Sequence, residues 1–579
     1  MKLKIQNHKI KVVALIILFS FSCTNKFEEI NTNEFIFSEA SPEELFSGVV
    51  INTLDLVGGT LNDQFYNTYA SYYGGKGGQF NRSFYTESGL DGFWKRFYVN
   101  ILKNNQDIID SHENDPAYTN RVYIAKIWKS YVYSIIVSTF GPVPYENASK
   151  GLNSVKYDSE EFIYTNILEE LKEATNNIDV SGDILKQDPI FNGDNSKWKK
   201  FANTLRLKIA LRISVGFPSL AKQHGSESIA DENNLVSSNS ENVTMKWGTE
   251  QENWSLNYSK YVNRQASDDV IPYLNFYFIL NFKTYKDPRL IAIAEPSSDP
   301  ITIRDEVFKS GSSTEKITVE YDIPYFGRPL GGSAVVEGWN LDANKNLLRG
   351  LPNRSYSQPK RDLFMAPDMT YNIITYAETN FIKAEAKLLE WGGTKSAEQY
   401  YYDGIDASFE QYGSTGNAEY KNRDGIKWGT VSIGDKGLFG LVTSGISSSP
   451  LDKIVRQRWL ASYNQGHDMW CVQKRTRILP LIDQFAPDGS SGLEYAPLSE
   501  RMIYPPLSEG GLNNEALQEA INALGGNTLY TPLKMNKEYT PIKWETLSDI
   551  VEFTQDFAKN FYGDSEDDLI DAGITYKII

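Results

Sequence analysis

The stretch 371–391, YNIITYAETNFIKAEAKLLEW, shows a helical repeat of apolar residues. Its apolar side chains are spaced by four, three and four residues: Ala377, Phe381, Ala384 and Leu388. This spacing places them on one face of a helix, and the two alanines let a second helix approach that face closely. We therefore expect a helix over Tyr371–Trp391 that ends at Gly392-Gly393 and packs on a partner over Ser396–Tyr412.

The same pattern recurs towards the N-terminus. Four apolar stripes predict four helices: Phe97, Ile101 and Ile108; Ile124, Trp128, Tyr131 and Ile135; Ile167, Leu171, Ala174 and Ile178; and Trp198, Ala202, Leu205 and Ile209. Another helix is expected from the N-cap Ser41 to about Leu56, before a break at Gly58-Gly59, and a last clear one over about Leu451–Lys474. Such paired helices resemble tetratricopeptide repeats, although no clean period of about 34 residues is visible.

Between about 216 and 367 the helical pattern weakens, apart from Asp268–Phe282, and Gly, Ser, Asn and Pro accumulate. Long irregular segments are uncommon in compact proteins unless they have a function. We expect a predominantly all-α protein with a helical-hairpin scaffold, about 41–215 and 368–480, and a loop-rich inserted ligand-binding subdomain, about 216–367. A mixed C-terminal segment, 481–579, is expected to hold short helices near Asn514–Leu524 and Thr546–Asn560.

The N-terminus predicts export. A short apolar run, Val12–Phe21, follows four lysines and ends at Ser22-Cys23. It is too short for the ~20 residues of a membrane span and matches a signal peptide over residues 1–22. A cysteine at the cut resembles the bacterial lipoprotein signal, so Cys23 is the predicted lipidation site and the start of the mature domain, 23–579. The alternative is an ordinary signal peptide beside an incidental cysteine.

The composition limits the possible partners. The net charge is -16, which disfavours nucleic acid and anionic membrane surfaces, because both attract a basic face. The chain has two cysteines, so lipidation of Cys23 leaves Cys471 without a partner for a disulfide. Because Cys471 follows Trp470 in an apolar helical stretch, we expect a buried, unreactive thiol.

The sequence predicts no catalytic, metal or cofactor site. Beyond the signal it holds three histidines, His112, His224 and His467, and none lies in an H-E-x-x-H motif. It has no G-x-S-x-G, G-x-x-x-x-G-K-[ST] or G-x-G-x-x-G sequence either. Paired carboxylates for glycoside hydrolysis stay open, because their separation is set in space and not along the chain.

Four segments of the chain resemble the SusD/RagB family of nutrient-binding outer-membrane lipoproteins. They are Phe140-Gly141-Pro142-Val143-Pro144-Tyr145; Tyr376-Ala377-Glu378 with Phe381-Ile382-Lys383-Ala384-Glu385-Ala386; Arg456-Gln457-Arg458-Trp459 with Gly466, Trp470, Lys474 and Arg475; and Arg501-Met502-Ile503-Tyr504-Pro505 with Glu509 and Asn513. Their order and spacing, together with the lipidated start, carry the resemblance. Residues 23–29, CTNKFEE, also resemble the tag that sends such lipoproteins to the cell surface. Glu34 departs from the family, where many members have Pro.

The resemblance implies a tetratricopeptide-like scaffold that rests against a SusC-like TonB-dependent transporter, with a variable loop region facing the ligand. It implies binding without turnover of a nutrient, most often a glycan such as an oligosaccharide. A peptide ligand, a purely structural adaptor and a surface enzyme are the alternatives. Most motif residues are expected to be scaffold: Gly141 and the prolines fix a turn, and Arg475 pairs with carboxylates or caps a helix.

Four aromatic side chains are the candidates for ligand binding: Tyr72, Tyr73, Trp254 and Tyr258. They lie outside the helical stripes, in two polar regions that carry glycine or asparagine. The first region, Tyr66–Gly92, is expected to end in an exposed loop around Gly74–Gly78. Aromatic rings offer flat apolar faces that stack on the C–H faces of sugars. For each candidate, a place in the core is the alternative.

Overall fold

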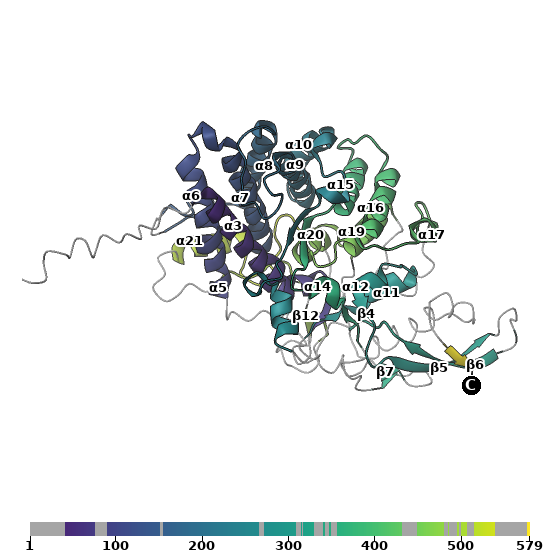
Figure 1. The fold of residues 1–579 in the computed structure, drawn as a ribbon. Helices are drawn as coiled ribbons and strands as arrows, with labels where there is room; N and C mark the ends of the chain where they lie inside the picture. Colours follow the sequence, from purple (N-terminus) through teal and green to yellow (C-terminus); the bar gives the residue numbers. More distant parts are fainter. Residues whose placement is uncertain are drawn as a thin grey trace, which may run out of the picture.

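The structure of the chain, a computed structural model, describes residues 41–75, 90–150, 154–265, 271–308, 314, 316–328, 340–341, 347–348, 356–430, 449–479, 484–485, 495–496, 499–505, 514–538 and 576–578. It is mostly helical, as predicted (Figure 1). The predicted lipidation site Cys23, most of the loop expected around Gly74–Gly78 and the helix expected over Thr546–Asn560 lie outside the described residues.

The first helix begins where the sequence predicts and ends later. Ser41 caps α3 (Pro42–Leu54) in a capping box with Glu44. The expected break at Gly58-Gly59 is wrong, because the helix continues as the π-helix η1 (Asp55–Tyr66). The two glycines serve close packing instead: a Cβ on Gly58 would lie 2.7 Å from the ring of Tyr371, and one on Gly59 would lie 3.0 Å from Leu256.

Consecutive helices then pack against one another, and the four predicted stripes are buried. These elements are α5 (Leu90–Lys95), η2 (Arg96–Leu102), α6 (Lys103–His112), α7 (Thr119–Phe140), α8 (Glu160–Asn177), α9 (Asn195–Arg212) and α10 (Pro218–Ala230). The helix α10 falls inside the predicted loop-rich insertion. Its buried side includes the small residues Ala221, Gly225 and Ser228, which give no apolar stripe. The helical part therefore extends to Ala230.

The rest of the insertion has short helices and small sheets. Its start and end are joined by β2 (Val243–Lys246) and β10 (Thr370–Ile374), which pair antiparallel. Between them lie η6 (Gln251–Asn253), η7 (Tyr258–Asn263), α11 (Phe276–Thr284), α12 (Leu290–Ile293), β5 (Ile301–Phe308), β6 (Lys316–Ile323) and α14 (Arg361–Phe364). The helix expected from Asp268 thus begins at Phe276. Strand β13 (Tyr576–Ile578) pairs with β6, opposite β5, at the lower right of Figure 1.

The quoted stretch forms two elements and not one. Residues 370–374 are β10, and Thr375 caps α15 (Tyr376–Leu388), so the helix begins later than predicted. Its partner α16 (Ala397–Gln411) begins after the N-cap Ser396, as predicted. The two helices meet closely, since a Cβ on Gly404 would lie 2.7 Å from the ring of Phe381.

The last long helix is also divided. Instead of one helix, the structure has α19 (Pro450–Ala461) and α20 (Gly466–Thr476). At the joint, Asn464 has a φ of 70°, and its backbone and side-chain oxygens accept hydrogen bonds from the Asn62 amide. A contact with a residue so distant in sequence leaves no local sign of the break.

The remaining elements are short. α21 (Asn514–Leu524) confirms the predicted C-terminal helix. The others are α4 (Asn67–Tyr69), η3 (Pro116–Tyr118), η4 (Glu232–Asn234), η5 (Asn239–Glu241), α17 (Asn417–Lys421), and the pairs β1–β3 (Tyr73–Gly75, Tyr273–Leu274), β4–β9 (Ala294–Glu295, Gln358–Pro359), β7–β8 (Asn340–Leu341, Leu347–Leu348) and β11–β12 (Gln484–Phe485, Tyr495–Ala496).

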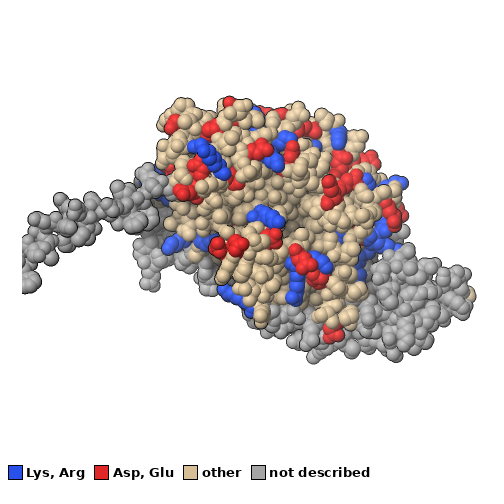
Figure 2. All heavy atoms as spheres, in the orientation of Figure 1, with Lys and Arg blue, Asp and Glu red and all other residues tan. Residues whose placement is uncertain are grey.

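A buried network of charges joins the scaffold helices. On the outside, Lys and Arg lie among Asp and Glu on the face shown in Figure 2. Inside, Lys208 of α9 contacts Glu378 of α15 at 3.1 Å and Asp468 of α20 at 2.7 Å. Arg212 of α9 binds the other oxygen of Asp468 at 2.6 Å, and Arg458 of α19 binds Glu378 at 2.8 Å. Two carboxylates and three cations thus bring four helices together.

We predict that Asp468→Asn lowers the free energy of unfolding by about 3–5 kcal/mol, because it removes the buried carboxylate that Lys208 and Arg212 share. Asp403→Asn is the matched control. Asp403 pairs with Lys395 at 2.6 Å on the surface, so its loss should cost about 1 kcal/mol or less. Equal effects of the two substitutions in denaturant titrations would contradict the role of the network.

The ionisation of Asp468 predicts that the stability of the fold depends on pH. Burial alone raises the pKa of Asp468, but Lys208, Arg212 and His467 outweigh it and lower the pKa to about 2, from an ordinary 3.8. As the pH falls, the unfolded chain therefore binds this proton first. The stabilisation from Asp468 should be complete above the ordinary pKa and be lost as the pH falls through about 2, and Asp468→Asn should remove this part of the acid sensitivity.

Candidate ligand-binding surface and the family assignment

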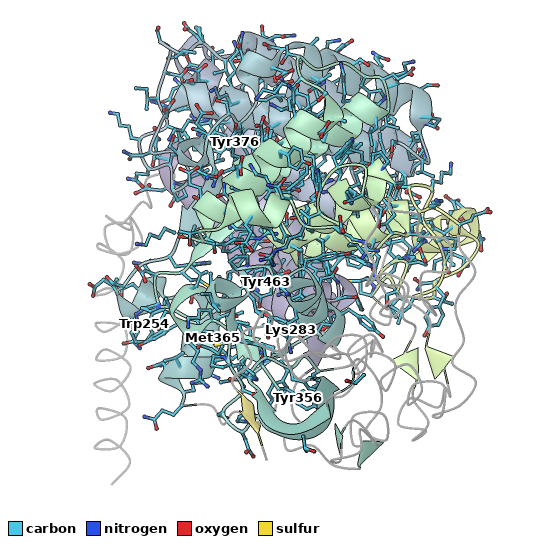
Figure 3. The ribbon with its side chains drawn as sticks, turned by 90° about the vertical axis from the view of Figure 1, so that its right-hand side faces the viewer. Trp254, Lys283, Tyr356, Met365, Tyr376 and Tyr463 are labelled. Atoms are coloured by element: carbon cyan, nitrogen blue, oxygen red, sulfur yellow. The ribbon has the colours of Figure 1, made fainter. Side chains whose placement is uncertain are left out.

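Trp254 and Tyr258, the two candidates in the insertion, lie side by side. Their ring centroids are 4.8 Å apart and the ring planes meet at 72°. Trp254 follows η6 with an extended backbone, and Tyr258 begins η7. Both side chains are half-buried. Figure 3 shows Trp254 at the edge of the described part, in contrast to Tyr463 in its interior.

Hydrogen bonds of the backbone hold this segment in place. The indole N–H of Trp254 donates to the Thr249 carbonyl at 2.8 Å, and the Gly248 N–H donates to the Asn253 carbonyl at 2.8 Å. Ser255 donates from its N–H to the Pro367 carbonyl at 2.9 Å and from its hydroxyl to the Ala366 carbonyl at 2.8 Å. Since the indole N–H is already bonded, the exposed part of the Trp254 ring is left for stacking.

Exposed polar residues directly precede the aromatic pair in the sequence. Residues 249–253 are all exposed and supply a hydroxyl, two amides and two carboxylates: Thr249, Glu250, Gln251, Glu252 and Asn253. Hydroxyl-rich ligands need such groups around an apolar platform, because the rings contact the C–H face of a sugar while polar side chains bond to its edge. The segment thus presents an aromatic pair beside exposed hydroxyl, amide and carboxylate groups.

The other two candidates, Tyr72 and Tyr73, lie in the core. The Tyr72 side chain has an exposed fraction of 0%, and its ring stacks on Trp459 with the planes 10° apart. Its hydroxyl donates to the carbonyls of Trp459 and Ser462 at 2.7 and 2.8 Å. Tyr73 is 4% exposed and lies in β1. In this structure neither ring has a face exposed to a ligand. Both residues therefore take the place in the core that was the alternative for each candidate.

At Gly74 the structure differs from the exposed loop that the sequence predicts. Gly74 does not loosen a loop there: a Cβ would lie 1.9 Å from the carbonyl oxygen of Arg328. The glycine allows two strands of backbone to come close, and β1 pairs with β3 of the insertion. A glycine required for close approach has the same local sequence as a glycine in a loop.

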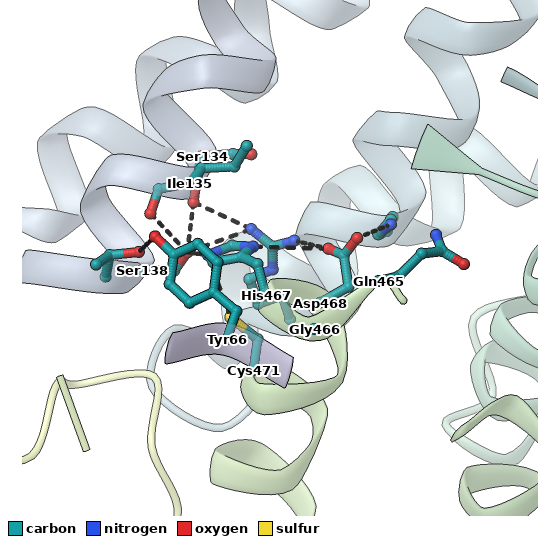
Figure 4. A network of polar contacts seen from close by, with 12 residues as sticks. Tyr66, Ser134, Ile135, Ser138, Gln465, Gly466, His467, Asp468 and Cys471 are labelled. Atoms are coloured by element: carbon teal, nitrogen blue, oxygen red, sulfur yellow. Dashed lines mark hydrogen bonds and ion pairs between the residues drawn. The ribbon is translucent and has the colours of Figure 1, made fainter. Parts of the chain in front are cut away.

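A buried Cys–His pair, which the sequence analysis did not predict, lies on α20 (Figure 4). The Cys471 sulfur is 3.8 Å from Nε2 of His467, which also contacts the Ser138 hydroxyl at 3.0 Å. Burial raises the pKa of the Cys471 thiol, but His467, Arg212 and Lys474 outweigh it and lower the pKa to about 6. The spacing of four residues on a helix is the signal that could have revealed the pair. Cys471 is only 1% exposed, which keeps substrates away from the thiol.

In the described parts of the chain, three or more His, Cys, Asp or Glu side chains do not gather where they could hold a metal ion. Over the same residues, none of the helices has the length and apolar character needed to cross a bilayer.

Comparison with known proteins assigns the family. The family model described as "Starch-binding associating with outer membrane" matches residues 34–324, and the one described as "Susd and RagB outer membrane lipoprotein" matches residues 337–545. The chain belongs to the SusD/RagB family of outer-membrane lipoproteins. This confirms the resemblance and places the protein at the outer membrane as a lipoprotein. A search of curated proteins found no match.

Solved structures support the SusD-like fold. A chitin-binding protein shares 22% identity, with a TM-score of 0.66, over 86% of this chain and 100% of its own. A chitin-binding SusD homologue from Flavobacterium johnsoniae shares 19% identity, with a TM-score of 0.66, over 87% and 100%. A SusD homologue from Bacteroides uniformis shares 23% identity, with a TM-score of 0.64, over 85% and 99%. At these identities the likeness concerns the fold.

The SusD-family motifs contact one another in pairs. Glu378 and Glu385 of α15 bind Arg458 and Arg475 of the late helices, and Arg475 reaches both oxygens of Glu385. The predicted pairing of Arg475 with a carboxylate is thus confirmed. Tyr504 donates its hydroxyl to the Pro142 carbonyl at 2.5 Å, which joins the C-terminal motif to the turn after α7. These residues form scaffold contacts, as the sequence analysis expects of most of them.

We predict that Cys471 reacts slowly in the folded protein despite its lowered pKa, because a thiol reagent cannot reach it. In a Cys23→Ala variant, Cys471 is the one remaining cysteine. Reaction with Ellman's reagent should be slow in buffer and fast in denaturant. A cysteine introduced at the exposed Ser181 in a chain without Cys23 and Cys471 is the control for fast reaction. Equally fast labelling of native Cys471 would show that the thiol is accessible.

Proposed function

We propose that this SusD-family protein binds a glycan, most specifically an oligosaccharide, on the surface formed by Trp254 and Tyr258, and passes it to a SusC-like TonB-dependent transporter. The observation that carries the proposal is the half-buried aromatic pair on an irregular segment, with five exposed polar side chains next to it. The names of two similar structures, which describe chitin-binding proteins, support a carbohydrate ligand. The transporter partner is supported by the resemblance to the family.

The physical basis of binding would be ring stacking combined with hydrogen bonds. Trp254 can offer only apolar contact, because its N–H is engaged by Thr249. Orientation of the sugar must therefore come from the amide and carboxylate groups of residues 250–253. Two rings that meet at an angle form a corner and not a flat platform. Such a corner fits a bent chain of sugars better than a flat crystalline surface.

We expect Trp254→Ala to weaken oligosaccharide binding by about 2 kcal/mol, roughly 30-fold in Kd, because a central aromatic anchor dominates a small interface. Tyr258→Ala should have a smaller effect in the same direction. Isothermal titration calorimetry with chitin-derived and starch-derived oligosaccharides measures both. Tyr123→Ala is the control, since Tyr123 is also half-buried but lies on α7.

Absence of binding to every glycan tested would contradict a glycan-binding function. Binding of unmodified peptides that also depends on Trp254 would assign the surface to the alternative ligand class. Glycan binding that Trp254→Ala and Tyr258→Ala leave unchanged would place the site elsewhere on the chain.

The lipid anchor is tested separately. If Cys23 carries the lipid, Cys23→Ala should release the protein from the membrane fraction, because in the wild type the acyl chains hold it there. Immunoblots of the membrane and soluble fractions measure this, and mass spectrometry of the wild type should find acyl groups on the N-terminal peptide. A Cys23→Ala protein that stays in the membrane fraction would contradict the assignment.

A further inference from the structure

The π-helix η7, which begins with Tyr258, is fixed to the π-helix η1 through one carboxylate. Lys260 contacts Oδ2 of Asp63 at 2.5 Å, and the hydroxyl of Tyr261 donates to Oδ1 of Asp63 at 2.5 Å. Both partners lie within three residues of Tyr258 and come from the same turn of η7. Asp63 and Tyr261 are buried, whereas the Lys260 side chain is 38% exposed. One buried carboxylate thus binds the segment through both of its oxygens.

The helix η1 that carries Asp63 is itself held firmly. The preceding residue, Asn62, donates from its amide to Asn464 at the joint between α19 and α20, and its Oδ1 accepts from the Gly466 N–H at 3.1 Å. Asn62 of η1 therefore binds the scaffold, and the next residue, Asp63, binds the insertion. π-Helical turns are rare and occur frequently at functional sites.

The residues between Trp254 and Tyr258 also contact η1 and the chain near α14. Leu256, midway between Trp254 and Tyr258, packs on Gly59 of η1, where a Cβ would lie 3.0 Å from its side chain. On the other side, Asn257 donates to the Phe364 carbonyl at 3.1 Å. The segment 254–261 is therefore held between η1 and the chain around α14. Within this segment, the contacts to Asp63 are charge-assisted. They are therefore stronger than the neutral hydrogen bonds that the rest of the segment makes.

We propose that Asp63 is a positioning residue for ligand binding: its carboxylate, by holding Lys260 and Tyr261, fixes the angle at which Trp254 and Tyr258 meet. This inference rests on the proposed function of that surface. A ligand that binds a rigid pair of rings does not have to order them, so the carboxylate contributes to affinity without contacting the ligand. The exposed polar residues 249–253 supply the contacts that select the sugar, and Asp63 sets the geometry of the rings.

The test uses Asp63→Asn and, as a second variant, Lys260→Met. Asp63→Asn keeps the size of the side chain and removes its charge. Lys260→Met removes the ammonium group, the half-exposed partner of the ion pair. Glu170→Gln is the matched control: Glu170 also binds a lysine, Lys129, at 2.5 Å and a hydroxyl, that of Ser130, at 3.0 Å, but on α7 and α8. All variants are made in the full mature chain.

Two readouts are needed. The first is the Kd for an oligosaccharide that the wild type binds, measured by calorimetry beside the melting temperature. The second is the ¹⁹F resonance of Trp254 in protein labelled with 5-fluorotryptophan, assigned by its loss in Trp254→Phe. Asp63→Asn and Lys260→Met should weaken binding about tenfold, as expected when rings must be ordered on binding, and should shift or broaden the Trp254 resonance. Glu170→Gln should change neither readout.

A double variant separates positioning from general damage. Once Trp254 is removed, Asp63→Asn should weaken binding much less than it does in the wild type, because the two residues act through the same surface. The inference is overturned if Asp63→Asn and Lys260→Met both leave the Kd and the Trp254 resonance as in the wild type. If the wild type binds no glycan, the proposed function fails, whereas the resonance still shows whether Asp63 orders Trp254.

Discussion

The charges that meet between α9, α15, α19 and α20 determine how this scaffold can be built. Glu378 and Asp468 are shared among Lys208, Arg212 and Arg458. Burying such groups is costly unless every one has partners, so these ion pairs favour the observed arrangement of the helices over arrangements that separate the charges. The hydrophobic stripes supply the driving force for packing, and the charges select one register among the packings that the stripes allow.

The network also reaches the insertion. The Ile373 carbonyl of β10 accepts hydrogen bonds from Lys208 and Gln465, each at 3.1 Å. Because β10 pairs with β2, both ends of the insertion are tied to the same point of the scaffold. The aromatic segment that follows β2 therefore leaves the scaffold at a fixed place. An irregular segment can hold a binding surface when its two ends and its middle are fixed in this way.

The sequence predicted the helices whose apolar residues repeat regularly, and its polar regions outside those helices pointed to Trp254 and Tyr258 as candidates. It failed where distant residues decide the local structure. Gly58 accommodates Tyr371, Gly74 accommodates Arg328, and Asn464 binds Asn62, and none of these contacts leaves a mark in the nearby sequence. Tyr72 and Tyr73 lie in the core, which is the alternative that the sequence left open for each candidate. The contact of Asp63 with η7 links segments far apart in the chain, so spacing alone could not reveal it.

Hydrogen–deuterium exchange of the mature protein, with and without a saturating oligosaccharide, is the most direct test of a rigid scaffold that presents a binding segment. The backbone amides of 249–263 should become protected when the sugar binds, while those of α9, α15, α19 and α20 should be the slowest to exchange in both states. Protection confined to other residues, with 249–263 unchanged, would contradict the account.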